Sequence, residues 1–360
     1  MSAFVAATFL LGLCLANAVN FTTVYEWEWD TFDFVWPSGA DSSIGQIKDE
    51  YKPGNVYAAH MAVFGERLFL SLDANPGIPA TLVWLPTSDT STPPPKLAPF
   101  QSWHLHKKDN CDTIQVARGM DTDSDGRLWV LDEGNRNCPG KIWIFNLVNN
   151  DTTERIHQFP DSVVSHSYDK RYLRDIVLDK TLDDYLAYIA DSQIEHFIVY
   201  NQKMDKSWSV KTPGRRWFSL ALSPNREARQ LLYLGRYDSN ELYSLSVSEL
   251  KNEGGSAAVK FIGKWTEDPY RMLIDRSNVL FAAFLNQNYL FKWNISEPFT
   301  EQRFHEVGKL DDAVNWPFTF ALDTNGILWM MERYVTVGRI RALRHNLLKA
   351  AVGADLPLRG

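Results

Sequence analysis

Short apolar runs alternate with acidic or glycine-containing turns along this chain. The clearest example is Gly119–Gly134 (GMDTDSDGRLWVLDEG), in which Met120 precedes an acidic turn and the apolar run Leu128–Leu131 follows it. An Asp-Gly turn between two short apolar runs is typical of a β-hairpin. The pattern therefore predicts strand, tight turn and strand in this segment.

The same pattern occurs five more times, in residues 61–73, 176–191, 220–235, 272–284 and 320–332. The last apolar residues before the six turns are Val63, Met120, Leu178, Leu222, Ile274 and Leu322. These markers recur at similar intervals of roughly 50 residues, which is typical of a propeller blade built from about four strands. We therefore predict an all-β fold, a six-bladed β-propeller.

The N-terminal segment predicts how the ring closes. Residues 21–34 (FTTVYEWEWDTFDF) alternate apolar and polar side chains, which is typical of a strand with one buried face. This strand precedes the first repeat, whereas the last repeat has only residues 339–344 to add before the C-terminal tail. We expect the N-terminal strand to complete the last blade, because this removes an exposed sheet edge.

The segment Met1–Ala18 predicts a secretory signal peptide. The apolar run Phe4–Leu15 ends at Ala16-Asn17-Ala18, a small-x-small cleavage pattern. The run is shorter than the roughly 20 residues that a spanning helix needs, so we expect no membrane span. We expect a secreted, extracellular protein with a signal peptide over residues 1–18, one propeller domain over 19–345 and a C-terminal tail over 346–360.

Cys14 lies in the predicted signal peptide, so two cysteines stay in the mature chain. In a secreted protein these cysteines can form a disulfide, and N-glycosylation sequons can be used. Cys111 and Cys138 flank the hairpin at residues 119–134, and an even number in a secreted chain favours a disulfide, with a catalytic free thiol as the alternative. The three predicted N-glycosylation sites are Asn20, Asn150 and Asn294.

The net charge and the motifs of the chain argue against several classes of function. A net charge of −7 argues against nucleic acid as a partner. The sequence has no phosphate-binding loop, nucleophile elbow or zinc-protease helix, and we expect neither a cofactor nor a resident metal. Two weaker metal patterns have simpler explanations. Asp121, Asp123 and Asp125 match the spacing of a calcium loop but lie in a hairpin turn, and His104 and His106 share one strand face without further ligands.

Candidate binding residues follow from the blade pattern, because inner strands direct one end toward the mouth of the central channel. These candidates are His60, Arg118, Asp175, Phe218, Tyr270, Trp316, Phe318, Thr319 and Glu332. Carboxylates and aromatic rings around one opening suit a protonated aromatic amine. Alternatively, the charges tie neighbouring blades, for example Arg174 or Arg118 with Asp175 or Asp132.

The segments GRLWVLDEG (126–134), CPGKIWIFNL (138–147), RYLRDIVLD (171–179), FSLALSP (218–224) and WPFTFALDTNGILWM (316–330) resemble the Yellow and major royal jelly protein family. The resemblance implies a secreted six-bladed propeller. Members include pigmentation proteins, dopachrome-converting enzymes, royal jelly nutrients and salivary proteins that bind biogenic amines. The chain departs from the family at Asp125, where many relatives carry Cys, and at Met331-Glu332, where relatives often have Ser-Asn.

We therefore expect a monomeric, non-catalytic protein that binds a small molecule, a biogenic amine, in its central funnel. One alternative is a dopachrome-converting isomerase with His60 as the candidate base, because this reaction moves a proton. Another is a calcium-dependent propeller hydrolase with a metal in the channel. Glu332 is expected either to pair with the ligand ammonium or to be tied to a blade arginine in a structural role.

Overall fold

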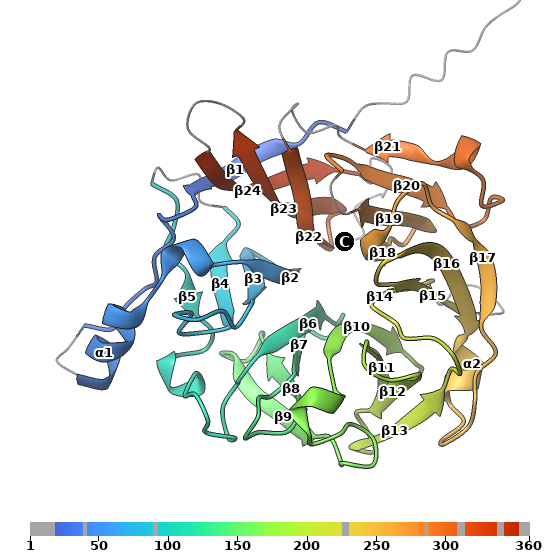
Figure 1. The fold of residues 1–360 in the computed structure, drawn as a ribbon, viewed down its shortest axis with the longest axis horizontal. Helices are drawn as coiled ribbons and strands as arrows, with labels where there is room; N and C mark the ends of the chain where they lie inside the picture. Colours follow the sequence, from blue (N-terminus) through green and yellow to red (C-terminus); the bar gives the residue numbers. More distant parts are fainter. Residues whose placement is uncertain are drawn as a thin grey trace, which may run out of the picture.

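The computed structural model describes residues 19–38, 42–88, 93–224, 230–284, 287–307, 314–336 and 342–352, with only the backbone described for 42–44, 314–318, 334–336 and 342–343. Six four-stranded antiparallel sheets stand around a common centre (Figure 1). The predicted six-bladed β-propeller is confirmed. The predicted signal peptide lies outside the described residues.

The first three blades are formed in chain order, each from its innermost to its outermost strand. Blade one consists of β2 (Ala58–Phe64), β3 (Arg67–Leu72), β4 (Leu82–Pro86) and β5 (Ala98–Pro99). Blade two consists of β6 (Ala117–Thr122), β7 (Arg127–Asp132), β8 (Lys141–Asn146) and β9 (Thr152–Gln158). Blade three consists of β10 (Leu173–Lys180), β11 (Tyr185–Asp191), β12 (His196–Asn201) and β13 (Lys206–Lys211).

The other three blades complete the ring. Blade four consists of β14 (Ser219–Leu222), β15 (Leu231–Arg236), β16 (Ser239–Ser246) and β17 (Lys260–Lys264). Blade five consists of β18 (Pro269–Ile274), β19 (Val279–Phe284), β20 (Leu290–Asn294) and β21 (His305–Val307). Blade six consists of β22 (Val314–Leu322), β23 (Ile327–Thr336), β24 (Ala342–Ala351) and β1 (Thr22–Glu28). The described helices are short: α1 (Ser42–Glu50), α2 (Val247–Leu250) and the 3-10 turns η1 (Pro53–Asn55), η2 (Trp103–Leu105), η3 (Tyr168–Lys170) and η4 (Glu301–Arg303).

The N-terminal strand closes the ring. β1 pairs antiparallel with β24, and the alternating side chains Tyr25 and Trp27 are buried. The predicted closure is therefore confirmed. β24 runs to Ala351, past residue 345, the predicted end of the propeller domain. The strand continues because the expected tail carries Leu347 and Leu348, both buried.

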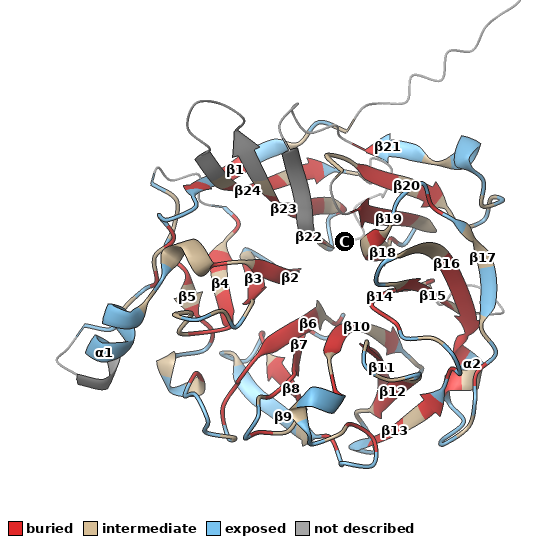
Figure 2. Cartoon of the chain, in the orientation of Figure 1, coloured by how far each residue is buried: buried red, intermediate tan, exposed pale blue. Residues whose placement is uncertain are grey.

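The hydrophobic core lies between the blades. Trp129 and Ile144 of blade two, for example, share a buried cluster with Tyr185 and Ile198 of blade three. Burial is greatest in the inner and middle strands, whereas outer strands such as β9 are largely exposed (Figure 2). Each blade therefore stabilises its neighbours through apolar faces, which fits the apolar runs in the repeats.

The turn between β6 and β7 is held by one carboxylate. Asp123 Oδ1 accepts hydrogen bonds from the backbone N of Asp125 and of Arg127, both at 3.0 Å. Asp123 Oδ2 accepts from Arg127 Nε at 2.6 Å and from Trp129 Nε1 at 2.8 Å. The hydrogen bond from the Trp129 indole to Asp123 thus gives a physical reason for the spacing between the aspartate and the Leu-Trp pair in the sequence.

The last hairpin repeats this arrangement. Asp323 Oδ1 accepts from the backbone N of Asn325 and Ile327, and Asp323 Oδ2 accepts from Trp329 Nε1 at 3.1 Å. Asp275 of blade five likewise accepts from two backbone N–H groups of its own turn. These bonds satisfy turn groups that would otherwise lack partners.

A disulfide joins Cys111 to Cys138, with the two Cα atoms 5.1 Å apart. It links the connection before β6 to the connection between β7 and β8. The predicted disulfide is confirmed, and the free-thiol alternative is wrong.

Candidate functional site

The inner strands of five blades share one irregularity near their N-terminal ends. In five blades the register between the first and second strands shifts there, for example between Ala58 and His60 and between Leu173 and Asp175. The other shifts lie between Ala117 and Met120, Pro269 and Arg271, and Pro317 and Thr319. A bulge of this kind redirects the side chains beside it.

The bulges define two sets of equivalent positions. We call the first the mouth ring: Ala59, Arg118, Arg174, Phe218, Tyr270 and Phe318. We call the next position along each strand the throat ring: His60, Gly119, Asp175, Ser219, Arg271 and Thr319. Outside blade two, the throat residues pair with equivalent positions of the second strands, namely Ser71, Ala190, Gly235, Ala283 and Met331.

Throat residues from alternate blades meet across the centre. His60 Nδ1 of blade one lies 3.9 Å from Asp175 Oδ1 of blade three. Arg271 of blade five donates a hydrogen bond from Nη1 to the same Asp175 oxygen. Asp175 Oδ2 accepts from the backbone N of Leu220 at 2.8 Å. Since blades one, three and five are not neighbours, the contacts narrow the channel at this level.

Several throat atoms are buried without a hydrogen-bond partner among the described residues. They are both ring nitrogens of His60, Ser219 Oγ, Arg271 Nε and Thr319 Oγ1. A buried polar group without a partner costs about 1 to 3 kcal/mol. Buried polar atoms in proteins are normally bonded, so a set of them around one axis indicates a place for a polar occupant.

Two ionisable groups in and below the throat have shifted pKa values. Burial, together with Arg271, Arg174 and Arg118, lowers the pKa of His60 well below its usual value, so the imidazole is neutral at physiological pH. Two positions beyond Gly119 along β6, burial raises the pKa of Asp121 to about 6.

Blade two contributes a glycine to the throat ring, and the reason is steric. A Cβ at Gly119 would lie 2.9 Å from Ile176 N and 3.0 Å from the Asp175 Cα atom. Such close contacts with backbone leave no room for a side chain, so the first strands of blades two and three approach closely at this point.

The mouth ring holds an arginine between aromatic rings. The Arg174 guanidinium lies 4.2 Å from the ring centroid of Phe218. It also donates to the hydroxyls of Tyr172 and Tyr270, each at 3.2 Å. Phe218 and Tyr270 in turn pack with their ring centroids 5.5 Å apart. Blades three, four and five therefore share one aromatic and cationic cluster at the mouth, in which Arg174 and Phe218 are buried.

The second arginine of the mouth ring organises two carboxylates. Arg118 Nε donates to Glu133 Oε2 at 2.7 Å, and Arg118 Nη1 donates to Asp73 Oδ1 of blade one at 2.8 Å. The guanidinium lies over the Tyr172 ring, 5.4 Å from its centroid. Glu133 Oε1 is buried without a partner among the described residues, and burial raises the pKa of this carboxyl despite the neighbouring Arg118.

Six of the nine residues proposed from the sequence lie in the two rings with described side chains: His60, Arg118, Asp175, Phe218, Tyr270 and Thr319. The Trp316 and Phe318 side chains lie outside the described part. Glu332 is buried in β23, and its Oε1 accepts from Asn346 Nδ2 at 2.7 Å.

Arg271 and Ser219 also belong to this arrangement but were not predicted from the sequence. Ser219 and Arg271 stand three residues before Leu222 and Ile274, the same offset that separates His60 from Val63. That repeat offset was the available signal. The expected ties between blades exist with different partners, because Arg118 pairs with Glu133 and Asp73, and Asp175 with Arg271.

The metal patterns have other roles in the structure. Among the described residues, no group of three or more His, Cys, Asp or Glu side chains is arranged to hold a metal ion. The expectation that His104 and His106 share a strand face is wrong. The segment is the 3-10 turn η2, with His104 exposed and His106 buried against Phe100, whose carbonyl oxygen lies 2.7 Å from His106 Nε2. A helix that turns every three residues separates the two imidazoles.

The three predicted glycosylation sites differ in how far they are exposed. Asn20 and Asn150 are exposed, and Asn294 is partly exposed at the end of β20. Within the part of the chain that is described, no helix is long and apolar enough to cross a membrane.

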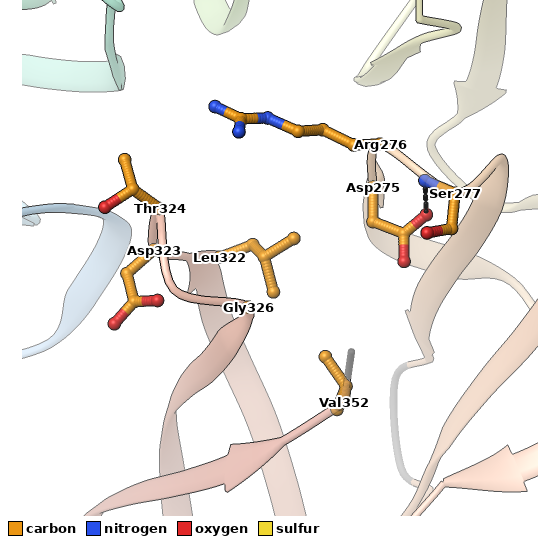
Figure 3. A pocket seen from close by; sticks show the side chains of 8 residues that line it. All are labelled: Asp275, Arg276, Ser277, Leu322, Asp323, Thr324, Gly326 and Val352. Atoms are coloured by element: carbon orange, nitrogen blue, oxygen red, sulfur yellow. Dashed lines mark hydrogen bonds between the residues drawn. The ribbon is translucent and has the colours of Figure 1, made fainter. Parts of the chain in front are cut away.

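A separate small pocket lies at the opposite, turn end of blades five and six (Figure 3). Its lining residues are Asp275, Arg276, Ser277, Leu322, Asp323, Thr324, Gly326 and Val352. Its volume of about 40 Å³ is far below the several hundred Å³ typical of a site for a drug-sized ligand. A second hollow of about 450 Å³ lies at the turn end of blades two and three, and charged side chains such as Asp125, Arg127 and Lys180 make up most of its lining. Its lining suits an aromatic molecule less well than the aromatic rings of the mouth ring.

Solved structures with the same fold include two that are similar in shape. A gluconolactonase from Xanthomonas campestris superposes with a TM-score of 0.51 at 13% identity and covers 81% of this chain and 86% of its own. A luciferin-regenerating enzyme gives a TM-score of 0.52 at 12% identity and covers 84% of this chain and 93% of its own. At this identity the likeness concerns the fold alone.

Sequence relatives are closer. Protein yellow of Drosophila subobscura is 26% identical over 348 residues, covering 85% of this chain and 60% of that protein. Protein yellow of Drosophila erecta is 26% identical over 366 residues, covering 90% of this chain and 66% of that protein. The chain thus spans less than two thirds of the length of these relatives. The family model described as major royal jelly protein matches residues 116–216 and 212–340. The chain belongs to the major royal jelly protein family.

Proposed function

We propose that this protein is an extracellular binding protein for a small aromatic amine, which lies in the mouth of the propeller. The observation that carries the proposal is the buried Glu133 Oε1, which has no partner among the described residues and belongs to the Arg118–Tyr172–Arg174 cluster. The aromatic rings of Phe218 and Tyr270 adjoin this cluster through Arg174.

Each half of such a ligand has a chemical counterpart at the mouth. An ammonium group needs an acceptor, and Glu133 Oε1 is a carboxylate oxygen in a low-dielectric position where a charge-assisted hydrogen bond is strong. The ring of the ligand needs an aromatic or apolar face, and Tyr172, Phe218 and Tyr270 supply such faces. Arg118 and Arg174 hold these groups in place, which reduces the entropy that the site loses on binding.

Glu332 is the second candidate acceptor. It stands at the mouth end of β23, opposite Pro317 in β22, and it is buried. Its carboxylate adds a negative charge to the rim of the site. We propose that it strengthens the attraction for an ammonium group.

The geometry gives less support to the two enzymatic alternatives. Because burial and three arginines lower the pKa of His60, its imidazole is a weak base, whereas an isomerase needs a base matched to neutral pH. A calcium ion in the channel would face the Arg271 guanidinium, which lies in the throat and repels a cation.

The test is calorimetric titration of the purified protein with dopamine, serotonin and tyramine. We expect measurable binding of at least one amine and a loss of about ten-fold or more in affinity for Glu133→Gln, which keeps the shape but removes the charge. Glu332→Gln should weaken binding by a smaller factor. Glu306→Gln, an exposed residue on the outer strand β21, is the matched control. The absence of heat with every amine would disprove the proposal.

A further inference from the structure

A hydrogen-bonded chain of serine, histidine and aspartate links the outer strands of blades two and three, away from the central channel. His157 belongs to β9 and Ser207 to β13, the strands at the rim of these blades (Figure 1), and Asp205 comes directly before β13. His157 Nε2 lies 2.9 Å from Ser207 Oγ, and His157 Nδ1 lies 3.1 Å from Asp205 Oδ1. These are the contacts of a nucleophile, a general base and a carboxylate that orients the base.

The protonation of the His157 ring follows from its two partners. An ionised carboxylate only accepts hydrogen bonds, so Nδ1, which faces Asp205, carries the proton. Nε2 of the neutral ring is then the acceptor, and the Ser207 hydroxyl donates to it. Burial lowers the pKa of His157 although the neighbouring Asp205 opposes this shift, so the ring is neutral at physiological pH and can take the serine proton.

The surrounding side chains hold the base and the carboxylate in place. The centroid of the His157 ring lies 4.5 Å from that of Tyr200 and 5.6 Å from that of Phe159. The Tyr200 hydroxyl and Arg155 Nη1 donate to the Asp205 carboxylate at 3.0 Å and 3.1 Å. Both groups are therefore oriented before a substrate arrives, which lowers the entropic cost of the reaction.

The free edge of β13 supplies a donor for the negative charge that acyl transfer creates. The carbonyl oxygen of Ser209 bonds to the backbone N of Gly254, on the side of β13 that faces away from β12. Ser207 is two residues before Ser209 in the same strand, so its backbone N–H points to the same outer edge. The N–H group of a nucleophilic serine is one of the donors that bind the oxyanion in serine hydrolases.

The exposure of the three residues limits the size of a substrate. The side chain of Asp205 is 39% exposed and that of His157 is 10% exposed, whereas Ser207 as a whole is 7% exposed. The hollow of about 450 Å³ described above adjoins the carboxylate, because Arg155, which bonds to Asp205, is part of its lining. A hydroxyl with so little exposure admits only a small acyl group.

We propose that Ser207, His157 and Asp205 form a second site, which hydrolyses esters of short carboxylic acids. Ser207 Oγ attacks the acyl carbon while its proton passes to His157 Nε2. The bond from the acyl carbon to the alcohol oxygen breaks, and the imidazolium gives the proton to the leaving alcohol. Water then attacks the acyl-serine and gives a proton to His157. Release of the acid returns this proton to Ser207 Oγ.

Hydrolysis of p-nitrophenyl acetate and labelling by a fluorophosphonate test the proposal on the purified protein. We expect hydrolysis at least about ten-fold faster than in buffer, and a phosphonyl adduct that peptide mass spectrometry places on Ser207. Ser207→Ala and His157→Gln should lose both the activity and the adduct. Ser209→Ala, which removes a hydroxyl from the same face of the same strand, is the matched control and should keep both.

Asp205 acts through His157 and is a positioning residue, so its variant needs a separate measurement. Asp205→Asn keeps the shape of the side chain and tolerates the positive φ of 47° at this position. It removes the charge that stabilises the imidazolium, so kcat should fall by about ten-fold or more while KM stays unchanged. A kcat equal to that of the wild type would refute this role.

The absence of an adduct on Ser207, or equal hydrolysis by the wild type and Ser207→Ala, would overturn the proposal and leave the three residues as a tie between two blades. The adduct is mapped on the wild-type protein, so this result does not depend on whether a variant folds. Amine titration of Ser207→Ala tests the separation of the two sites. An unchanged amine affinity would support a second site, and a lost affinity in the folded variant would contradict it.

Discussion

The two ends of the inner hairpins differ in whether their polar groups have hydrogen-bond partners within the protein. At the turn end, Asp123 and Asp323 each satisfy two backbone N–H groups and a tryptophan indole within their own hairpin. At the mouth end, His60, Ser219 and Thr319 are buried with polar atoms that find no partner among the described residues.

The composition of the two ends differs accordingly. An aspartate opens the turn in blades two, five and six, whereas the six throat positions hold six different residues. A tight turn imposes the same backbone requirement on every blade, so the same residue solves it repeatedly. A position that faces the axis carries no such local requirement, and its chemistry can differ from blade to blade. The difference predicts that, within the inner hairpins, the turn residues contribute to stability and the throat residues contribute to binding.

The largest effect is expected at the turn end. Asp123→Ala removes four hydrogen bonds and leaves Arg127 Nε and Trp129 Nε1 without their acceptor, so the free energy of unfolding should fall by about 3 to 5 kcal/mol. Urea unfolding measures this loss. The exposed Asp125→Ala is the control and should cost less than about 1 kcal/mol. A loss no larger than that of the control would contradict the comparison.

A covalent link stabilises the mouth side of blade two. Replacing Cys111 and Cys138 together by serine should lower the free energy of unfolding by about 3 kcal/mol, because the unfolded chain regains the entropy of a loop of 27 residues. Chemical denaturation of the oxidised wild type and of the double variant gives the difference. Identical unfolding midpoints and slopes would show that the disulfide adds nothing to the fold.

Low pH should destabilise the protein by protonating His106, which precedes the mouth end of blade two. Burial lowers its pKa to about 4, below its ordinary value of 6.5. Its contribution is therefore complete above pH 6.5 and is lost as pH falls toward 4. Between pH 7 and 4.5 the wild type should lose about 2 kcal/mol more than His106→Gln, as measured by urea unfolding at both pH values. Parallel losses in the two proteins would refute this assignment.

The smallest effect on stability is expected in the throat. Thr319→Val replaces a hydroxyl that has no partner among the described residues with a methyl group of similar size, so the free energy of unfolding should change by less than about 1 kcal/mol. Thermal unfolding of the variant without ligand measures it. A loss as large as that of Asp123→Ala would mean that the two ends do not divide stability from binding.

The local pattern explains why so much of the fold was predictable. Alternation and turn residues identify a hairpin from neighbouring positions, as in residues 119–134, and six hairpins at similar spacing indicate six blades. The closing strand was also predictable, because the alternation in residues 21–34 marks a strand without a sequential partner. The end of β24 was not, since buried Leu347 and Leu348 are held by β23 on one side and on the other by β1, which comes from the opposite end of the chain.

The sequence by itself determined the repeating hairpins, their aspartate turns, the closing strand and the residues that reach the channel mouth, because each depends on neighbouring residues or on a regular repeat. Only the tertiary structure decided which of those residues meet. Arg271 bonds to Asp175 across 96 residues, and His60 reaches the same carboxylate from another blade. Such contacts exist only once the ring has closed, because closure alone brings alternate blades together at one axis.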